Sequence, residues 1–382
     1  MTTFRDLLSA PMPKDGVLRS TGKGTAEAIL PTPHIVNHAP SLIELHNGDL
    51  LMVWFAGDTE EGRSDIRIVQ SRLAKGETRW TDPVAISEDP VRSEQNPVLF
   101  QKKDGGLLLL HTAQAPREDK KEKYDPATNV DAATRQETSE IRSRLSLDNG
   151  YTWEPTQTFS ETPGSFCRAP IAELSNGDWI FPMWISRRDG NTVFGNDTSL
   201  VRISGDEGRT WQEVPIPGSR GRVHPNIIEW GEGRLSAFFR SRSADWIYVS
   251  RSDDWGRSWT EPERTTLPNN NASIRAIKLQ SGRLAVIYNH FQAGDDSAAT
   301  IWPKTRFPVS IALSEDEGRT WPYIRQLEQG DGFTGEANKH LNRTYEYPWL
   351  FQANDGLIHA AYAYGNRQAM KHVVLTEQWI TG

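Results

Sequence analysis

The octapeptide SEDEGRTW, residues 314–321, has three near-copies earlier in the chain. They are SLDNGYTW at 146–153, SGDEGRTW at 204–211 and SDDWGRSW at 252–259. In the shared pattern Ser-x-Asp-x-Gly-x-Thr/Ser-Trp, Asp can cap backbone N–H groups, Gly can adopt a positive φ and Trp can pack beneath a hairpin turn. The octads therefore predict four equivalent turns, and we expect their acidic residues to be structural rather than catalytic.

A weaker repeat of six β-hairpins alternates with the octads. Each copy is an apolar run, a polar turn containing Gly and a second apolar run. The copies begin near residues 38, 96, 168, 224, 274 and 347. Following segments, such as SLVRISG and PVSIALS, supply a third strand. Because repeated sheets of short strands are typical of propellers, we predict an all-β, six-bladed β-propeller, with seven blades as the alternative.

All 382 residues are interpreted as one propeller domain. Residues 1–35 form an N-terminal arm, whose segment TAEAIL supplies an outer strand that closes the ring, and residues 36–382 carry the blades. The polar interruptions at 114–139, 290–305 and 327–345 are expected to be loops over one face. The 14 tryptophans and 30 glycines agree with an aromatic-rich, turn-rich β fold.

Composition narrows the classes of partner. Lys and Arg number 43 against 50 Asp and Glu, a net charge of −7, which argues against a nucleic-acid-binding surface. No stretch approaches the roughly 20 apolar residues of a membrane span, and the single cysteine, Cys167, excludes an internal disulfide framework.

The N-terminus lacks the apolar core of a secretory signal, so we expect a cytoplasmic or non-classically secreted protein. We expect a monomer that needs no cofactor, and a structural metal ion in the central channel is left open.

The octads resemble the Asp-boxes, or BNR repeats, of the sialidase superfamily, and the hairpins resemble that family's blades along nearly the whole chain. Sialidases are exo-acting glycosidases. Their sites hold three arginines that bind the substrate carboxylate, a Tyr nucleophile assisted by Glu, and an Asp acid/base. The resemblance implies a carbohydrate site of this kind in the funnel of the propeller.

Three positions match the family's motifs. Arg240 in LSAFFRSRS is similar to the second arginine, Arg306 in TRFPVSIALSEDEG to the third, and Tyr347 in EYPWLF to the nucleophile. Two arginines still suit a carboxylate ligand, because a guanidinium can bind it with paired donors.

Other positions depart from the family. His38 in the HAP motif replaces the first arginine, and His224 in VHPNIIEW falls where the assisting Glu belongs. The acid/base matches Asp58 or Asp65 in GDTEEGRSD. Without Glu, a phenol with a pKa near 10 lacks its usual activator, which argues against sialidase activity.

The residue that opens each inner strand should point into the central funnel. These six residues are His38, Asn96, Arg168, His224, Arg275 and Tyr347. They include Arg and His but no carboxylate, which predicts an anion-binding pocket. Structural roles stay open: histidines that join blades, arginines paired with loop carboxylates, and a tyrosine packed in the channel. Trp302 and Trp349 are the candidates for sugar stacking, and we expect the octad tryptophans to be core.

These groups favour β-elimination at a uronic acid over hydrolysis. Hydrolysis at a sugar usually needs two carboxyl groups. Elimination instead needs arginine to neutralise the uronate carboxylate, a base such as His or Tyr to remove the C5 proton, and an acid for the leaving oxygen. The altered site resembles sialidase-related propellers that act on rhamnose–glucuronate linkages, including exo-type lyases. We therefore predict an exo-acting lyase for a terminal sugar on a uronate, with His38, His224 and Tyr347 as catalytic residues.

Two other functions stay open. One is an exo-sialidase or another sialidase-like glycoside hydrolase that uses Asp58 or Asp65. The other is a non-catalytic propeller that binds an acidic glycan. In each case the partner is an acidic oligosaccharide or polysaccharide, not a nucleic acid or a membrane. The residues expected to bind it are Asn96, Arg168, Arg240, Arg275, Arg306, Trp302 and Trp349.

Overall fold

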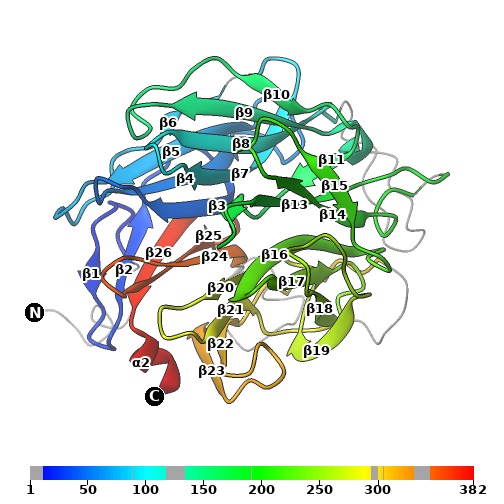
Figure 1. Cartoon of the computed structure of the whole chain (residues 1–382). Coiled ribbons are helices and arrows are strands. Elements are labelled where there is room, and N and C mark those ends of the chain that lie inside the picture. The colour runs from blue at the N-terminus through cyan, green and yellow to red at the C-terminus, as the bar shows by residue number, and fades with distance from the viewer. Residues whose placement is uncertain are drawn as a thin grey trace, which may run out of the picture.

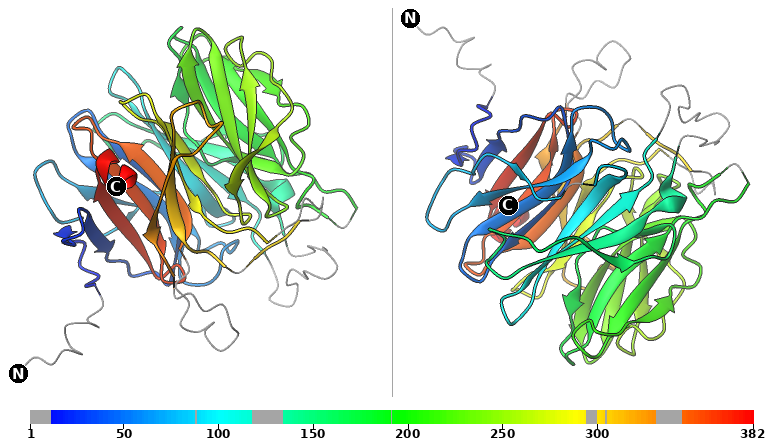
Figure 2. Two further views of the ribbon diagram at one scale, coloured as in Figure 1. Left: turned by 90° about the horizontal axis from the view of Figure 1, so that it is seen from below. Right: turned by 90° about the horizontal axis from the view of Figure 1, so that it is seen from above.

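The strands of this protein form six antiparallel sheets arranged around a common centre (Figure 1). The computed structural model describes residues 12–87, 89–117, 134–190, 192–293, 300–303, 305–330 and 345–382. Figure 2 shows the ring from two sides. Each sheet is one blade, which confirms the prediction of an all-β, six-bladed propeller. The predicted loops at 114–139, 290–305 and 327–345 fall partly outside the described residues.

In the first three blades the strands run in chain order from the centre outward. Blade 1 contains β3 (Val36–Glu44), β4 (Leu50–Gly57), β5 (Arg67–Leu73) and β6 (Val84–Ala85). Blade 2 contains β7 (Ser93–Gln101), β8 (Leu107–Gln114), β9 (Glu140–Ser146) and β10 (Gln157–Ser160), with the 3-10 helix η1 (Gln136–Thr138) before β9. Blade 3 has a split inner edge and contains β11 (Ser165–Cys167), β12 (Ala172–Glu173), β13 (Trp179–Ile185), β14 (Thr198–Ser204) and β15 (Gln212–Pro215).

The last three blades complete the ring. Blade 4 contains β16 (Arg222–Gly231), β17 (Arg234–Ser241), β18 (Trp246–Ser252) and β19 (Glu263–Pro268). Blade 5 contains β20 (Arg275–Lys278), β21 (Leu284–Asn289), β22 (Val309–Ser314) and β23 (Tyr323–Glu328). Blade 6 contains β24 (Glu346–Gln352), β25 (Ile358–Tyr364), β26 (Ala369–Leu375), β2 (Ala26–Leu30) and β1 (Arg19–Ser20). The short helix α2 (Glu377–Thr381) follows β26.

The ring is closed by the N-terminal arm, as expected for the segment TAEAIL. Strand β2 pairs antiparallel with β26, with Ala28 opposite His372. At the centre, β3 of blade 1 contacts both β7 of blade 2 and β24 of blade 6. Closure therefore brings residues from both ends of the chain to one central site.

The four octads fold into the same turn between the two outer strands of a blade. In the first octad, Ser146 Oγ accepts a 2.7 Å hydrogen bond from the N–H of Gly150, and Asp148 accepts bonds from the backbone and hydroxyl of Thr152. The same bonds recur in the other three octads. The Thr152 hydroxyl bond is the main reason that the pKa of Asp148 is lowered to about 2, so this carboxylate is an ionised turn cap.

The apolar core lies between neighbouring blades. Strand β4 is buried along its whole length, because its two faces pack against different sheets. The octad tryptophans also pack against core clusters, as expected; they are Trp153, Trp211, Trp259 and Trp321. Among the described residues, no helix is long and apolar enough to span a membrane.

Candidate active site

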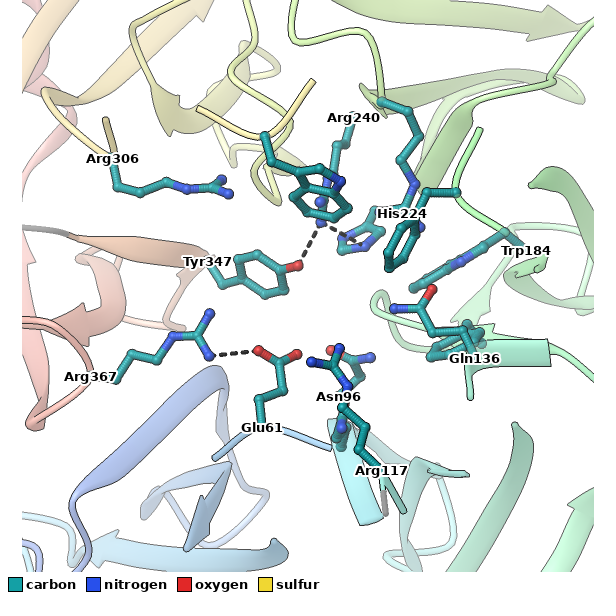
Figure 3. A pocket seen from close by; sticks show the side chains of 15 residues that line it. Glu61, Asn96, Arg117, Gln136, Trp184, His224, Arg240, Arg306, Tyr347 and Arg367 are labelled. Atoms are coloured by element: carbon teal, nitrogen blue, oxygen red, sulfur yellow. Dashed lines mark hydrogen bonds and ion pairs between the residues drawn. The ribbon is translucent and has the colours of Figure 1, made fainter. Parts of the chain in front are cut away.

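A cavity of about 300 Å³ is lined by residues from all six blades (Figure 3). Its walls contain five arginines and one carboxylate. The lining residues are Glu61, Gln95, Asn96, Arg117, Gln136, Phe166, Trp184, Phe194, His224, Arg240, Arg242, Trp302, Arg306, Tyr347 and Arg367. This volume lies at the small end of the range for ligand pockets. None of the octad residues lines it.

A recurring β-bulge aims three side chains into the cavity. The register of β7, β16 and β24 against their neighbouring strands shifts near the start of each strand. The residues at these shifts are Asn96, His224 and Tyr347, with positive φ angles of 51°, 56° and 50°, and each precedes a proline. Bulges beside active sites re-aim side chains in this way. The predicted funnel position of these three residues is therefore correct.

Blade 1 has the same bulge, but its bulged residue is Ala39, with a φ of 55°. His38 comes one residue earlier, is fully buried and lies behind Tyr347, with 4.1 Å between the ring centroids. Our expectation that His38 faces the funnel is wrong, because successive strand residues point to opposite faces. Burial, followed by the charge of Arg367, holds the pKa of His38 well below 6.5, so its imidazole is neutral.

Tyr347 and His224 both accept a hydrogen bond from the guanidinium of Arg240. Arg240 Nη1 donates to the phenolic oxygen of Tyr347 at 2.6 Å and to Nε2 of His224 at 3.2 Å. Because a guanidinium can only donate, Nε2 accepts, and the imidazole proton sits on Nδ1, which donates to Ser273 Oγ at 3.0 Å. Burial and then Arg240 hold the pKa of His224 well below 6.5. The ring also stacks on Trp184, at 4.4 Å between centroids.

Asn271 holds both arginines that the sequence assigned to the substrate carboxylate. Its side-chain oxygen accepts from Arg240 Nε at 2.8 Å, and its backbone carbonyl accepts from Arg306 Nη1 at 3.1 Å. Asn271 is fully buried and has a φ of 54°, a conformation that Asn tolerates better than most residues. Sequence analysis missed this residue, whose only signal is its place in an Asn-rich loop.

A chain of opposite charges runs along one wall. Arg367 donates to Glu61 at 2.6 Å and also binds Glu346, and Glu346 lies 3.4 Å from Arg306. Burial would raise the pKa of each carboxyl, but the neighbouring positive groups, Arg367 first among them, together outweigh burial and lower the pKa of Glu61 and of Glu346. Both carboxylates are therefore ionised. The expectation of a pocket without acidic groups is wrong, because Glu61, which lines it, comes from a loop and not from the opening of an inner strand.

The opposite wall is fixed by a buried ion pair. Asp197 binds Arg242 through two hydrogen bonds of 2.9 and 3.1 Å. The guanidinium groups of Arg242 and Arg240 lie 5.4 and 5.3 Å from the ring of Trp302. Trp302 therefore lines the cavity as expected of a stacking candidate.

Other predicted residues lie outside the cavity lining. Arg168, like His38, precedes an Ala-Pro pair; it is buried and donates to the backbone carbonyl of Pro40 at 2.9 Å. Its guanidinium and that of Arg275 lie 5.1 and 4.4 Å from the ring of Trp349. Trp349 is 3% exposed, so it is a buried partner for these arginines and is not a sugar platform.

The loop after β4 contributes a different acid from those expected. Asp58 is 65% exposed and pairs with His34, and Asp65 accepts from the Asp58 N–H within the loop. Glu61 of the same loop lines the cavity instead. In Figure 3 its carboxylate and the phenol of Tyr347 point into the pocket from different walls. Among the described residues, no three His, Cys, Asp or Glu side chains are grouped as metal ligands would be.

A family model described as a BNR repeat-like domain matches residues 48–360. The chain belongs to this family. No curated protein matches it in sequence.

Solved structures share the fold over nearly the whole chain. A protein of unknown function from Dyadobacter fermentans DSM 18053 is 19% identical, with a TM-score of 0.69 over 92% of this chain and 98% of that one. The intramolecular trans-sialidase from Ruminococcus gnavus is 15% identical (TM-score 0.64; 91% and 95% covered). The NanB sialidase from Streptococcus pneumoniae is 14% identical (TM-score 0.68; 99% and 73% covered). At these identities the similarity establishes a sialidase-like propeller fold and leaves the activity open.

Proposed function

We propose that this protein is an exo-acting lyase that releases a terminal sugar from a uronic acid by β-elimination. The observation that carries the proposal is the 2.6 Å hydrogen bond from Arg240 to the phenolic oxygen of Tyr347, beside a neutral histidine and not a carboxylate. The phenolic oxygen that accepts this bond faces a cavity lined by arginines.

The proposed reaction begins with the uronate carboxylate bound between Arg240 and Arg306. Neutralising this carboxylate makes the C5 proton more acidic. The Tyr347 phenolate removes that proton, the C5–H electrons form a C4–C5 double bond, and the C4–O bond breaks. The leaving oxygen then takes the proton from Tyr347. The phenolate is restored and no water is consumed.

Tyr347 fits the role of base better than either histidine. The Nε2 lone pair of His224 already accepts from Arg240, so His224 acts as a positioning residue. His38 is fully buried behind Tyr347. Of the two types of base that the sequence left open, His and Tyr, the proposal therefore takes Tyr347, which carries the proton in both directions.

One observation favours a second function, hydrolysis in the manner of a sialidase-like glycosidase. Glu61 lines the cavity and comes from the loop where the resemblance expects the acid/base. A general acid must carry a proton, however, and ion pairing with Arg367 lowers the pKa of Glu61 despite its burial. An ionised Glu61 therefore supports elimination over hydrolysis.

The products distinguish the two reactions. Incubation with a neutral sugar linked to O4 of glucuronate should give the intact neutral sugar and a conjugated, ultraviolet-absorbing unsaturated uronate. A saturated glucuronate product, heavier by one water, would contradict the proposal.

A further inference from the structure

The five arginines of the cavity differ in how their charge is compensated. Three have carboxylate partners: Arg242 pairs with Asp197, Arg306 with Glu346, and Arg367 with Glu61 and Glu346. In the described part of the chain, no carboxylate lies within salt-bridge distance of Arg117 or Arg240. Arg240 is bound by Asn271, His224 and Tyr347, none of which is a carboxylate. Among the described residues, Arg117 and Arg240 are therefore the two cavity arginines without a carboxylate at salt-bridge distance, although the charge of Arg117 still acts on Glu61.

Arg117 is held in place although, among the described residues, its guanidinium has no ion pair within salt-bridge distance; its charge acts on Glu61 from farther away. Its backbone N–H donates to Gly62 O at 2.8 Å, and its carbonyl accepts from Arg63. Gly62 has a φ of 90°, and a Cβ at this position would lie 2.9 Å from Arg117 Nε. The missing side chain of Gly62 thus makes room for Arg117. Nε itself is buried and makes no hydrogen bond.

Two amides stand near Arg117 on the cavity wall. The side-chain nitrogen of Asn96 makes only a 3.5 Å contact with Thr112, and Gln136 accepts a 3.5 Å bond from Ser186 through its oxygen. Both amides line the cavity with Arg117. Amide N–H groups beside a guanidinium are suitable donors for an oxyanion. In Figure 3, Arg117 and Arg240 enter the pocket from opposite sides.

We propose that the cavity binds a ligand with two separate anionic groups. The uronate carboxylate lies at Arg240, which rests on the proposed function, and a second anionic group on the adjoining sugar lies at Arg117, Asn96 and Gln136. The second group is a sulfate ester or another uronate carboxylate. A substrate of this class places one anion beside each of the two guanidinium groups that lack a carboxylate at salt-bridge distance.

The test is calorimetric binding to the Tyr347→Phe variant, which keeps the aromatic ring and should not turn substrate over. Three ligands are compared at constant ionic strength: a neutral sugar linked to glucuronate, the same disaccharide with a sulfate ester on the neutral sugar, and a diuronate disaccharide. At least one dianionic ligand should bind at least about tenfold more tightly than the monoanionic one. Adding Arg117→Gln should remove that preference, and adding Arg209→Gln, at an exposed octad position, should keep it.

The ligand that is preferred identifies the second group as sulfate or carboxylate. Equal binding of all three ligands, or an equal loss for all three in Arg117→Gln, would overturn the proposal. The lyase proposal is judged separately on the unchanged protein. If the dianionic ligands bind more tightly but no unsaturated product forms, the Arg117 subsite is retained and the lyase proposal is rejected.

Discussion

Arg240 donates a 2.6 Å hydrogen bond to the phenolic oxygen of Tyr347, although the two residues are 107 positions apart in the chain. Arg240 lies next to the end of β17 in blade 4 and Tyr347 is the second residue of β24 in blade 6, so only the closed ring brings them together. Arg240 is fully buried, where a charge-assisted hydrogen bond is strong and an unpaired charge is costly. The pair thus links the architecture of the propeller to its proposed chemistry.

Removing the phenolic oxygen should abolish turnover and leave the fold intact. In Tyr347→Phe we expect the turnover number to fall by at least about 100-fold, because the proton carrier is lost. The free energy of unfolding should fall by about 1.5–3 kcal/mol, since one hydrogen bond to a buried charge disappears. Tyr151→Phe, at a 64% exposed octad position, is the matched control and should retain both activity and stability. Near-normal turnover in Tyr347→Phe would exclude Tyr347 as the base.

The two histidines should respond differently to substitution. His224→Ala removes the acceptor for Arg240 Nη1, so turnover should fall by about 100-fold, and His224→Gln, whose amide oxygen can still accept, should recover part of it. His38→Ala empties a fully buried site and should chiefly lower the thermal midpoint. Steady-state kinetics and thermal unfolding of the three variants check this. A larger kinetic loss in His38→Ala than in His224→Ala would contradict the positions seen here.

Asn271 should control substrate binding through the two arginines that it holds. In Asn271→Gly the positive φ is kept, but Arg240 Nε loses its acceptor, so KM for acidic substrates should rise several-fold. Asn271→Ala should add a stability cost of about 1–2 kcal/mol, because a Cβ is disfavoured at positive φ. Kinetics with acidic and neutral substrate analogues would show the difference. Equal losses for both analogues would mean that Asn271 acts only in folding.

Stability should decrease in mild acid. Burial lowers the pKa of His359 to about 4, and holds those of His38, His224 and His372 well below 6.5. Below pH 6.5 the unfolded chain therefore binds protons that the folded protein does not, and each histidine costs about 1.4 kcal/mol per pH unit until its folded pKa is reached. Unfolding midpoints between pH 7.5 and 5 measure this slope. His359→Gln should flatten it and His46→Gln, at an exposed position, should not; a pH-independent midpoint would contradict the prediction.

The fold was predictable because its signals are local. Octads and hairpins are short patterns that set turns and strands by themselves, and the ring-closing strand was visible as an apolar segment without a partner. The residues that open the inner strands and face the funnel were predicted less well. Asn96, His224 and Tyr347 were correctly placed, and His38 and Arg168 were not, because a one-residue shift turns a side chain to the other face. The Asn-Pro, His-Pro and Tyr-Pro pairs marked the bulge, and Ala39-Pro40 marks it in blade 1.

The remaining site residues were missed because loops bring them in from distant positions. Glu61, Arg117 and Arg367 lie in separate connections, and no spacing within the sequence relates them. Their pairing follows from tertiary geometry: Arg367 binds Glu61 across 306 residues of chain. The charge balance of the cavity, and hence the distinction between an acid and an ionised partner, depends on these contacts.

The loss of turnover in the Glu61→Gln variant distinguishes elimination from hydrolysis. In elimination, Glu61 serves only to pair with Arg367, so turnover should stay within about tenfold of the unchanged protein. In hydrolysis it would be the acid/base, and its loss should cost at least about 100-fold. Steady-state turnover with one glycosyl-uronate substrate, measured on both proteins, decides between these outcomes.

The most direct measurement is cleavage of a glycosyl-glucuronate in water labelled with oxygen-18, followed by mass spectrometry of both products. Elimination breaks the C4–O bond without consuming water, so the uronate should be lighter by one water than glucuronate. The released sugar should carry no label when the reaction is stopped before its anomeric hydroxyl exchanges with the labelled water. Incorporation of one labelled oxygen at the cleaved linkage, with a saturated uronate, would contradict β-elimination and establish hydrolysis in its place.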